Sequence, residues 1–155
     1  MAVKFVSNEE LKVVTKPWGW EKWLQAGDDV YPFVLKQLLL KAGQRTSLQV
    51  HQVKSETIMI LEGNGTLLTY DPFFDCELYL QGEYSDNVLE HIKDNLVAHP
   101  ISAGAIFHTP PGTIHRMIAE TDLLYIEAST TQLDDVVRLQ DDQKRDHGRI
   151  DSEHK

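Results

Sequence analysis

The stretch that decides the fold reads Gly43-Gln-Arg-Thr-Ser-Leu-Gln49-Val-His51-Gln-Val-Lys-Ser-Glu56-Thr-Ile-Met-Ile-Leu-Glu-Gly63. Residues two apart on a β-strand share a face, so Gln49 and His51 are expected to project together. A turn near Lys54 would return the chain and place Glu56 opposite them on the next strand. The stretch therefore predicts two adjoining strands whose polar side chains converge.

A second stretch reads Gly104-Ala-Ile-Phe-His-Thr-Pro-Pro-Gly-Thr-Ile-His115 and ends with another imidazole after a rigid Pro-Pro-Gly turn. Imidazole nitrogen, carboxylate oxygen and amide oxygen together form a borderline-hard ligand set. Such a set suits Zn²⁺, Mn²⁺, Fe²⁺, Co²⁺ or Ni²⁺ better than the ions that prefer thiolates. The sequence predicts one divalent metal ion held by Gln49, His51, Glu56 and His115.

Short apolar and β-branched runs recur between turn residues along most of the chain. We expect strands at 34–40, 48–53, 57–61, 66–70, 77–80, 105–109, 114–119 and 123–128. Short, regularly spaced strands of this kind favour an all-β sandwich or barrel. The run 57–61 is apolar on both faces, which predicts that one face packs against a second sheet or a partner subunit. We therefore expect a homodimer.

The two metal-ligand stretches resemble the two motifs of the cupin superfamily. Gly43, five residues, Gln49-Val50-His51, four residues, Glu56, six residues and Gly63 match the first motif, with Gln49 in place of its first histidine. Gly104, five residues, Pro110-Pro111-Gly112, two residues and His115 match the second, with Ala119 in place of its asparagine. The resemblance implies an all-β cupin, a jelly-roll barrel of the double-stranded β-helix type.

More specific similarity points to the type II phosphomannose isomerases, which form the C-terminal domain of bifunctional mannose-1-phosphate guanylyltransferases. The resemblance spans about residues 16–142. The residues that carry it are Lys16-Pro17-Trp18-Gly19-Trp20, Val34-Leu35-Lys36, the segment from Gly43 to Gln49, Pro111-Gly112-Thr113-Ile114-His115-Arg116, and Val136-Val137-Arg138-Leu139. The family usually has a second histidine where Val53 stands, and its inter-motif region is shorter than 70–102.

This resemblance implies a metal-dependent aldose–ketose isomerase that interconverts mannose 6-phosphate and fructose 6-phosphate. Zn²⁺ is the expected ion, with Mn²⁺, Co²⁺, Fe²⁺ and Ni²⁺ as alternatives. Lys36 and Arg116 are expected to be catalytic, and Arg45, Lys36 and Arg116 are expected to contact the phosphate of the phosphosugar. The general base stays open between Lys36, His108 and a metal-bound hydroxide.

Two other function classes also fit the sequence, because one fold hosts many chemistries. One is another metal-dependent cupin enzyme, such as a dioxygenase or a different sugar isomerase or epimerase. The other is a sugar-binding cupin without catalytic activity. Iron dependence and oxygen consumption would distinguish a dioxygenase from the isomerase. Loss of activity in His51→Ala, without loss of folding, would distinguish the enzymes from the sugar-binding protein.

Composition limits the class of protein and the cell compartment to which the 155-residue chain can belong. Of its residues, 41% are hydrophobic and 25% are charged. A formal charge of −9 argues against nucleic-acid binding. No apolar run approaches the roughly 20 residues that span a bilayer, and the one cysteine, Cys76, has no partner for an internal disulfide. We expect a cytoplasmic protein without membrane contact.

The length of the chain and its two motifs predict one cupin domain over residues 1–155. Its core covers about 16–142, with a short arm at 1–15 that holds a helical turn or extended chain near Ser7. A polar tail follows at 143–155. Residues 71–100 resemble an insertion, and Leu89, Ile92 and Leu96 have the spacing of one or two helical turns.

Overall fold

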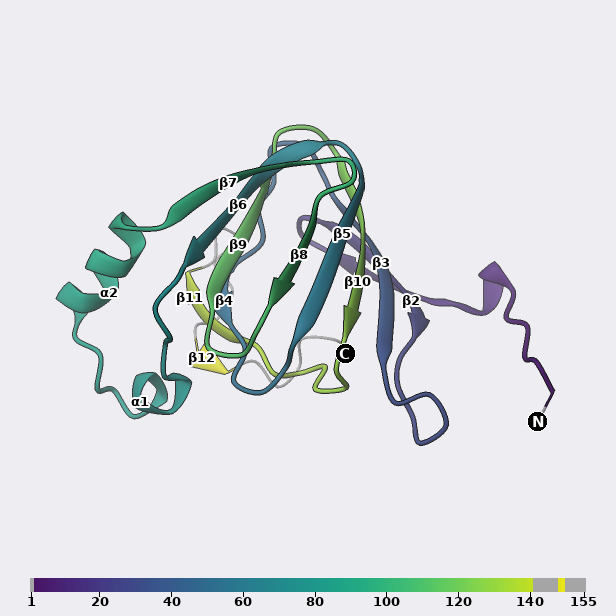
Figure 1. Ribbon diagram of the computed structural model, residues 1–155, viewed down its shortest axis with the longest axis horizontal. Helices are drawn as coiled ribbons and strands as arrows, with labels where there is room; N and C mark the ends of the chain where they lie inside the picture. The colour runs from purple at the N-terminus through teal and green to yellow at the C-terminus, as the bar shows by residue number, and fades with distance from the viewer. Residues whose placement is uncertain (1, 141–147, 150–155) are drawn as a thin grey trace.

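The computed structural model describes residues 2–140 and 148–149 and consists of two six-stranded sheets in which every pairing is antiparallel (Figure 1). Sheet I contains, in spatial order, β1 (Lys12–Lys16), β2 (Gly19–Gln25), β3 (Val34–Leu40), β10 (Leu123–Ser129), β5 (Glu56–Glu62) and β8 (Ile106–Thr109). Sheet II contains β12 (Gly148–Arg149), β11 (Val137–Gln140), β4 (Leu48–Val50), β9 (Ile114–Ala119), β6 (Asn64–Tyr70) and β7 (Val97–Ser102). The predicted all-β double-stranded β-helix class is confirmed.

The main core lies between the two sheets. Sheet I contributes residues such as Leu38, Ile60 and Leu123, and sheet II contributes Leu67 and Met117. On each strand these residues alternate with side chains that point away from the core, as the period of a β-strand requires. Burial of this kind stabilises the fold by about 25 cal/mol for each Å² of apolar surface removed from water. The core therefore fixes the register of the strands that carry the polar residues described below.

The insertion between β6 and β7 forms two helices, α1 (Cys76–Leu80) and α2 (Asp86–Asp94). α2 contains Leu89 and Ile92 and confirms the helical turns expected there, whereas Leu96 lies beyond its end. Phe74, Cys76 and Ile92 pack with residues of β4, β9 and β11 on the outward side of sheet II. The strand predicted at 77–80 is wrong: the carboxylate of Asp75 accepts a hydrogen bond from the N–H of Leu78 and caps a helix there.

The N-terminal segment differs from the expected arm. A helical turn is present at Asn8–Glu10, but β1 begins inside the predicted arm at 1–15, ends at Lys16, and pairs with β2, which the sequence did not indicate as a strand. β-branched Val13, Val14 and Thr15 favour this extended pairing. At the other end, Gly148–Arg149 pairs with β11 inside the predicted polar tail, and the rest of that tail lies outside the described residues.

The outward side of sheet I keeps apolar side chains at its surface. Ile106 on the edge strand β8 is 60% exposed, and Met59 on β5 is 41% exposed. In the part of the chain that the structure describes, no helix is long and apolar enough to cross a membrane. The predicted homodimer and the predicted domain limits stay predictions.

Candidate metal centre

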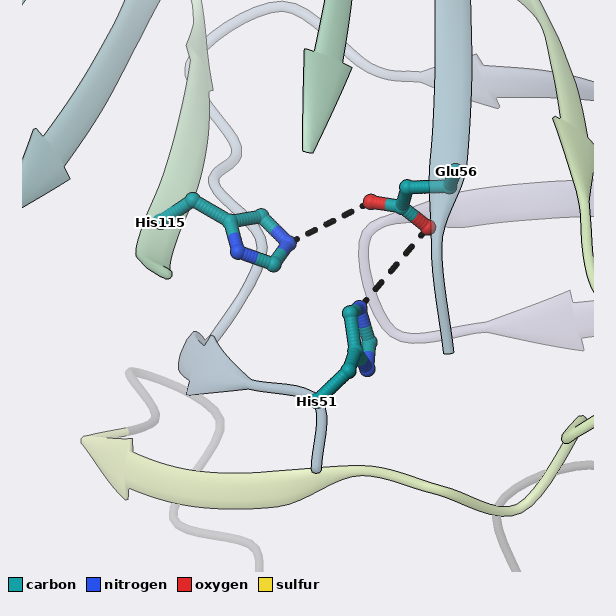
Figure 2. A group of neighbouring side chains, drawn as sticks. All are labelled: His51, Glu56 and His115. Atoms are coloured by element: carbon teal, nitrogen blue, oxygen red, sulfur yellow. Dashed lines mark ion pairs between the residues drawn. The ribbon is translucent and has the colours of Figure 1, made fainter. Parts of the chain in front are cut away.

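Three side chains converge on the inside of the molecule from three different segments (Figure 2). His51 directly follows β4, Glu56 begins β5, and His115 lies on β9. The Nε2 atom of His115 lies 3.3 Å from Glu56 Oε1, and that of His51 lies 3.7 Å from Glu56 Oε2. All three residues are buried, and their ligand atoms lie within 4.8 Å of one another. This group, called the triad below, has the residue types and spacing that can hold a metal ion.

Hydrogen bonds to main-chain carbonyls fix how both imidazole rings are oriented. Nδ1 of His51 donates to the carbonyl of Asp135 at 2.6 Å, and Nδ1 of His115 donates to the carbonyl of Thr113 at 2.9 Å. Because a carbonyl oxygen only accepts, the proton of each neutral ring sits on Nδ1 and the lone pair on Nε2. Both Nε2 atoms are buried and make no hydrogen bond. Two unsatisfied lone pairs aimed at one carboxylate fit a divalent ion.

The loop between His51 and Glu56 is clamped by the carboxylate of Asp135. Oδ1 accepts from the N–H of Gln52 at 3.0 Å, and Oδ2 accepts from the N–H groups of Val53 and Lys54 at 2.6 and 2.8 Å. Burial alone would raise the pKa of Asp135, but these three hydrogen bonds hold that pKa below its ordinary value. Asp135 thus positions two triad residues at once, through its side chain and its carbonyl.

The Glu56 carboxylate is kept ionised. Burial alone would raise the pKa of Glu56, but the ammonium of Lys54, whose Nζ lies 3.0 Å from Oε2, holds that pKa well below its usual value. Lys54 also contacts Glu127 Oε2 at 3.3 Å. Burial would lower the pKa of Lys54, but Glu127 and Glu56 keep it above its ordinary value. A charged carboxylate is the form that binds a metal ion.

Gln49, the fourth predicted ligand, lies on the same side of sheet II as the triad. It is paired directly opposite His115, so the two side chains share a face. Its Oε1 accepts a hydrogen bond from Ser47 Oγ at 2.8 Å. An amide oxygen has two lone pairs, so this bond leaves one lone pair available to an ion. The structure thus brings all four predicted ligands to one cavity.

A cavity of about 70 Å³ adjoins the triad and is lined by charged side chains from sheet I. Lys36 on β3 is 1% exposed, and its Nζ lies 3.8 Å from Glu21 Oε2. Burial lowers the pKa of Lys36, although Glu127 and Glu21 partly oppose this. Tyr125 also lines the cavity, and burial with the nearby carboxylates raises the pKa of its phenol well above the ordinary value. Acidic and basic groups therefore face the same enclosed space.

The other predicted substrate-contacting residues do not line this cavity. Arg116 follows His115 on β9, so its side chain points to the opposite face of sheet II, where its Nε donates to the carbonyl of Thr46 at 2.9 Å. Arg45 is exposed and forms an isolated bridge with Ile118. His108 is exposed on β8 and bonds to the hydroxyl of Thr57 at 2.8 Å. Of the predicted catalytic and phosphate-binding cations, the structure brings only Lys36 to the cavity.

Sequence reasoning missed Lys54, Glu127, Glu21 and Asp135. One of them had a detectable signal, because Glu127 shares the strand face of Leu123 and Tyr125, positions otherwise expected to be apolar. Glu21 lies on β2, which the sequence did not indicate as a strand. A charged residue on the buried face of a strand needs a buried partner or a function. Lys54 and Asp135 lie in loops and carry no such periodic signal.

Comparison with known proteins identifies the fold. No family model matches the chain, and no curated protein matches it. An uncharacterised conserved protein with a double-stranded β-helix domain from Klebsiella pneumoniae superposes with a TM-score of 0.58 at 10% identity, covering 90% of this chain and all of that one. The chain has the double-stranded β-helix fold of the cupins.

Two further solved structures share this cupin fold. CapF, a capsular polysaccharide assembling protein from Staphylococcus aureus, gives a TM-score of 0.61 at 16% identity, covering 84% of this chain and 32% of CapF. FeII HppE gives 0.58 at 12% identity, covering 82% of this chain and 60% of that chain. The chain thus spans about a third of the length of CapF. At such identities the likeness shows the fold, and function must be argued from the site.

Proposed function

We propose that this cupin-fold protein is a metal-dependent aldose–ketose isomerase. The observation that carries the proposal is the convergence of two unsatisfied Nε2 atoms, those of His51 and His115, on the ionised carboxylate of Glu56, beside the buried ammonium of Lys36. An isomerase of this kind needs a Lewis acid for the substrate oxygens together with groups that move protons between neighbouring atoms. The triad offers ligands for such a Lewis acid, and Lys36 is a proton donor that lines the same cavity.

In the proposed site, His51, Glu56, His115 and Gln49 hold one divalent ion. When bound, that ion supplies Lewis-acid polarisation of the substrate carbonyl. Lys36 faces the same cavity and donates a proton to the carbonyl oxygen, since burial lowers its pKa toward the range where an ammonium group is a useful acid. The charged side chains that line the cavity from sheet I are buried, which strengthens each of these electrostatic contacts.

Mannose 6-phosphate and fructose 6-phosphate are the proposed substrate pair, and the resemblance to type II phosphomannose isomerases supports it. Zn²⁺ is the proposed ion because two imidazoles and one carboxylate form a set that is common in catalytic zinc sites. Arg45 and Arg116, the predicted phosphate contacts, do not line this cavity, whereas Lys36 does.

The test is a coupled assay of mannose 6-phosphate conversion on chelator-treated protein that is reloaded with Zn²⁺, Mn²⁺, Co²⁺ or Fe²⁺. We expect activity to vanish with chelator, to return with one of these ions, and to be lost in His115→Ala. The matched control is His108→Ala, since His108 is an exposed histidine outside the cavity. Stoichiometric metal binding without turnover of any phosphosugar would refute the isomerase proposal.

A second candidate function is an iron-dependent oxygenase. Two histidines and one carboxylate form the ligand set of the non-haem Fe²⁺ oxygenases, and the triad matches that set. Oxygen consumption by the Fe²⁺-loaded protein, with no turnover of mannose 6-phosphate, would favour this candidate over the isomerase.

A further inference from the structure

Five buried side chains of alternating charge form a row that runs from the triad across sheet I. They begin at the triad carboxylate and are, in spatial order, Glu56, Lys54, Glu127, Lys36 and Glu21. Lys54 Nζ lies 3.0 Å from Glu56 and 3.3 Å from Glu127, and Lys36 interacts electrostatically with Glu127 and lies 3.8 Å from Glu21. Each carboxylate therefore has at least one ammonium group as a neighbour.

Glu21 and Glu127, the two carboxylates of this row beyond Glu56, differ in how many of their oxygens have a partner. Glu21 uses both oxygens, because Oε1 accepts from the indole N–H of Trp23 at 3.0 Å and Oε2 faces Lys36. Glu127 uses only Oε2, which accepts from Lys54. Within the described residues, Oε1 of Glu127 makes no hydrogen bond or ion pair, and its side chain keeps 10% of its surface accessible. Glu127 thus presents an open carboxylate oxygen to the cavity that the triad also lines.

We propose that Glu127 is the general base that carries a proton between two neighbouring carbons of the substrate. This inference rests on the proposed isomerase function and deepens it. In the first half of the reaction, Glu127 takes the proton from the carbon next to the carbonyl, while Lys36 gives a proton to the carbonyl oxygen. The C–H bond breaks, a C=C bond forms, and a neutral enediol results.

In the second half, the amine of Lys36 takes the proton of the neighbouring hydroxyl and a new C=O bond forms there. Glu127 returns its proton to the carbon that was the carbonyl. Both side chains regain their starting charge, no electrons leave the substrate, and no co-reactant is needed. The register supports this pairing, since Glu127 on β10 is directly opposite Lys36 on β3.

Other groups in the cavity fit the role of the base less well. Tyr125 keeps its proton, because burial and the carboxylates around it raise the pKa of the phenol, so it is suited to donate rather than accept. Lys54 is engaged by Glu56 and Glu127. His108, which the sequence left open as the base, bonds to Thr57 outside the cavity.

The experiment compares wild type with Glu127→Gln, Glu127→Asp and the control Glu120→Gln, which makes the same chemical change at an exposed residue. Zinc stoichiometry and the affinity for sorbitol 6-phosphate, a non-reacting polyol phosphate, are measured by calorimetry. Loss of deuterium from C2 of labelled mannose 6-phosphate reports proton abstraction. We expect Glu127→Gln to lower this exchange by about 10²–10⁴-fold, with zinc and polyol binding within about twofold of wild type.

The Asp variant restores a carboxylate and is expected to recover part of the exchange with kcat affected more than KM, which a purely structural role would not produce. Exchange in Glu127→Gln at the rate of the Glu120→Gln control would overturn the assignment. So would equal loss of exchange and of polyol binding. A wild type that turns over no phosphosugar refutes the proposed function itself, and the assignment of Glu127 with it.

Discussion

Replacing Asp135 with Asn tests whether one carboxylate holds the loop that positions the triad. The carboxylate accepts three main-chain N–H bonds, from Gln52 at 3.0 Å, Val53 at 2.6 Å and Lys54 at 2.8 Å. Asn keeps one carbonyl oxygen, which serves the position that accepts two bonds. Its NH₂ group then faces the N–H of Gln52, so two donors meet and one bond is lost.

The magnitude follows from these bonds. A hydrogen bond to a charged group contributes about 2 kcal/mol, and a neutral one about half as much. Losing one such bond and weakening two others by about 1 kcal/mol each lowers the free energy of unfolding by about 4 kcal/mol. For a chain of this size, that corresponds to a fall in Tm of roughly 8–16 °C. Because the loop places His51 and Glu56, metal affinity should also fall by about 10–100-fold.

The assay is thermal and urea unfolding of chelator-treated protein, followed by zinc titration calorimetry. Asp134→Asn is the matched control, because it makes the same change one residue away on an exposed side chain. We expect the control to stay within about 0.5 kcal/mol of wild type. Equal stability and equal zinc affinity in the two variants would show that the Asp135 carboxylate does not hold the loop between His51 and Glu56.

Four further predictions concern charge, metal and assembly. His115→Ala should abolish stoichiometric zinc binding, measured by metal analysis after dialysis. Lys54→Met should destabilise the metal-free protein by about 3–5 kcal/mol, since it leaves buried carboxylates uncompensated, and should tighten zinc binding because a cation 3.0 Å from Glu56 is removed. The pKa of Asp135 lies below its ordinary value of 3.8, so the stability difference between wild type and Asp135→Asn should persist above that pH and shrink as the pH falls below it. Ile106→Glu, on the exposed edge of sheet I, should convert a dimer into a monomer in sedimentation experiments.

Each of these expectations has a contrary result. Full zinc content in His115→Ala would remove that residue from the metal site. Weaker zinc binding in Lys54→Met would show that its ammonium supports the ion instead of competing with it. A constant stability difference down to pH 2 would exclude ionised Asp135 as its source. A monomeric wild type would refute the predicted homodimer.

The strands around the two motifs were predictable because turn residues bound them. The predicted 34–40 and 114–119 are the observed β3 and β9. β7 was missed since Pro100 weakens the strand signal, and proline is tolerated there because β7 is an edge strand. The segment 77–80 has strand-like alternation, but capping by Asp75 and packing against sheet II favour a helix. Local sequence pattern therefore fails to predict secondary structure where an edge position in a sheet or tertiary packing determines it.

The residues of the candidate site were also predictable only in part. Motif spacing predicted that His51, Glu56 and His115 would meet, because strand alternation and two tight turns bring them together. Alternation also places Arg116 on the face opposite His115, which the motif resemblance alone did not reveal. Glu127 lies 73 residues after Lys54 in the sequence, and only the sheet register brings the two together. Such long-range pairs leave no local trace in one sequence.

The most direct test of the metal centre is an anomalous difference map, recorded at the zinc absorption edge, from crystals of the zinc-loaded protein. We expect a single strong peak at bonding distance, about 2.0–2.2 Å, from His51 Nε2, His115 Nε2 and a carboxylate oxygen of Glu56. No peak among these three side chains, or a peak bound only by surface residues, would contradict the assignment of the triad as a metal site.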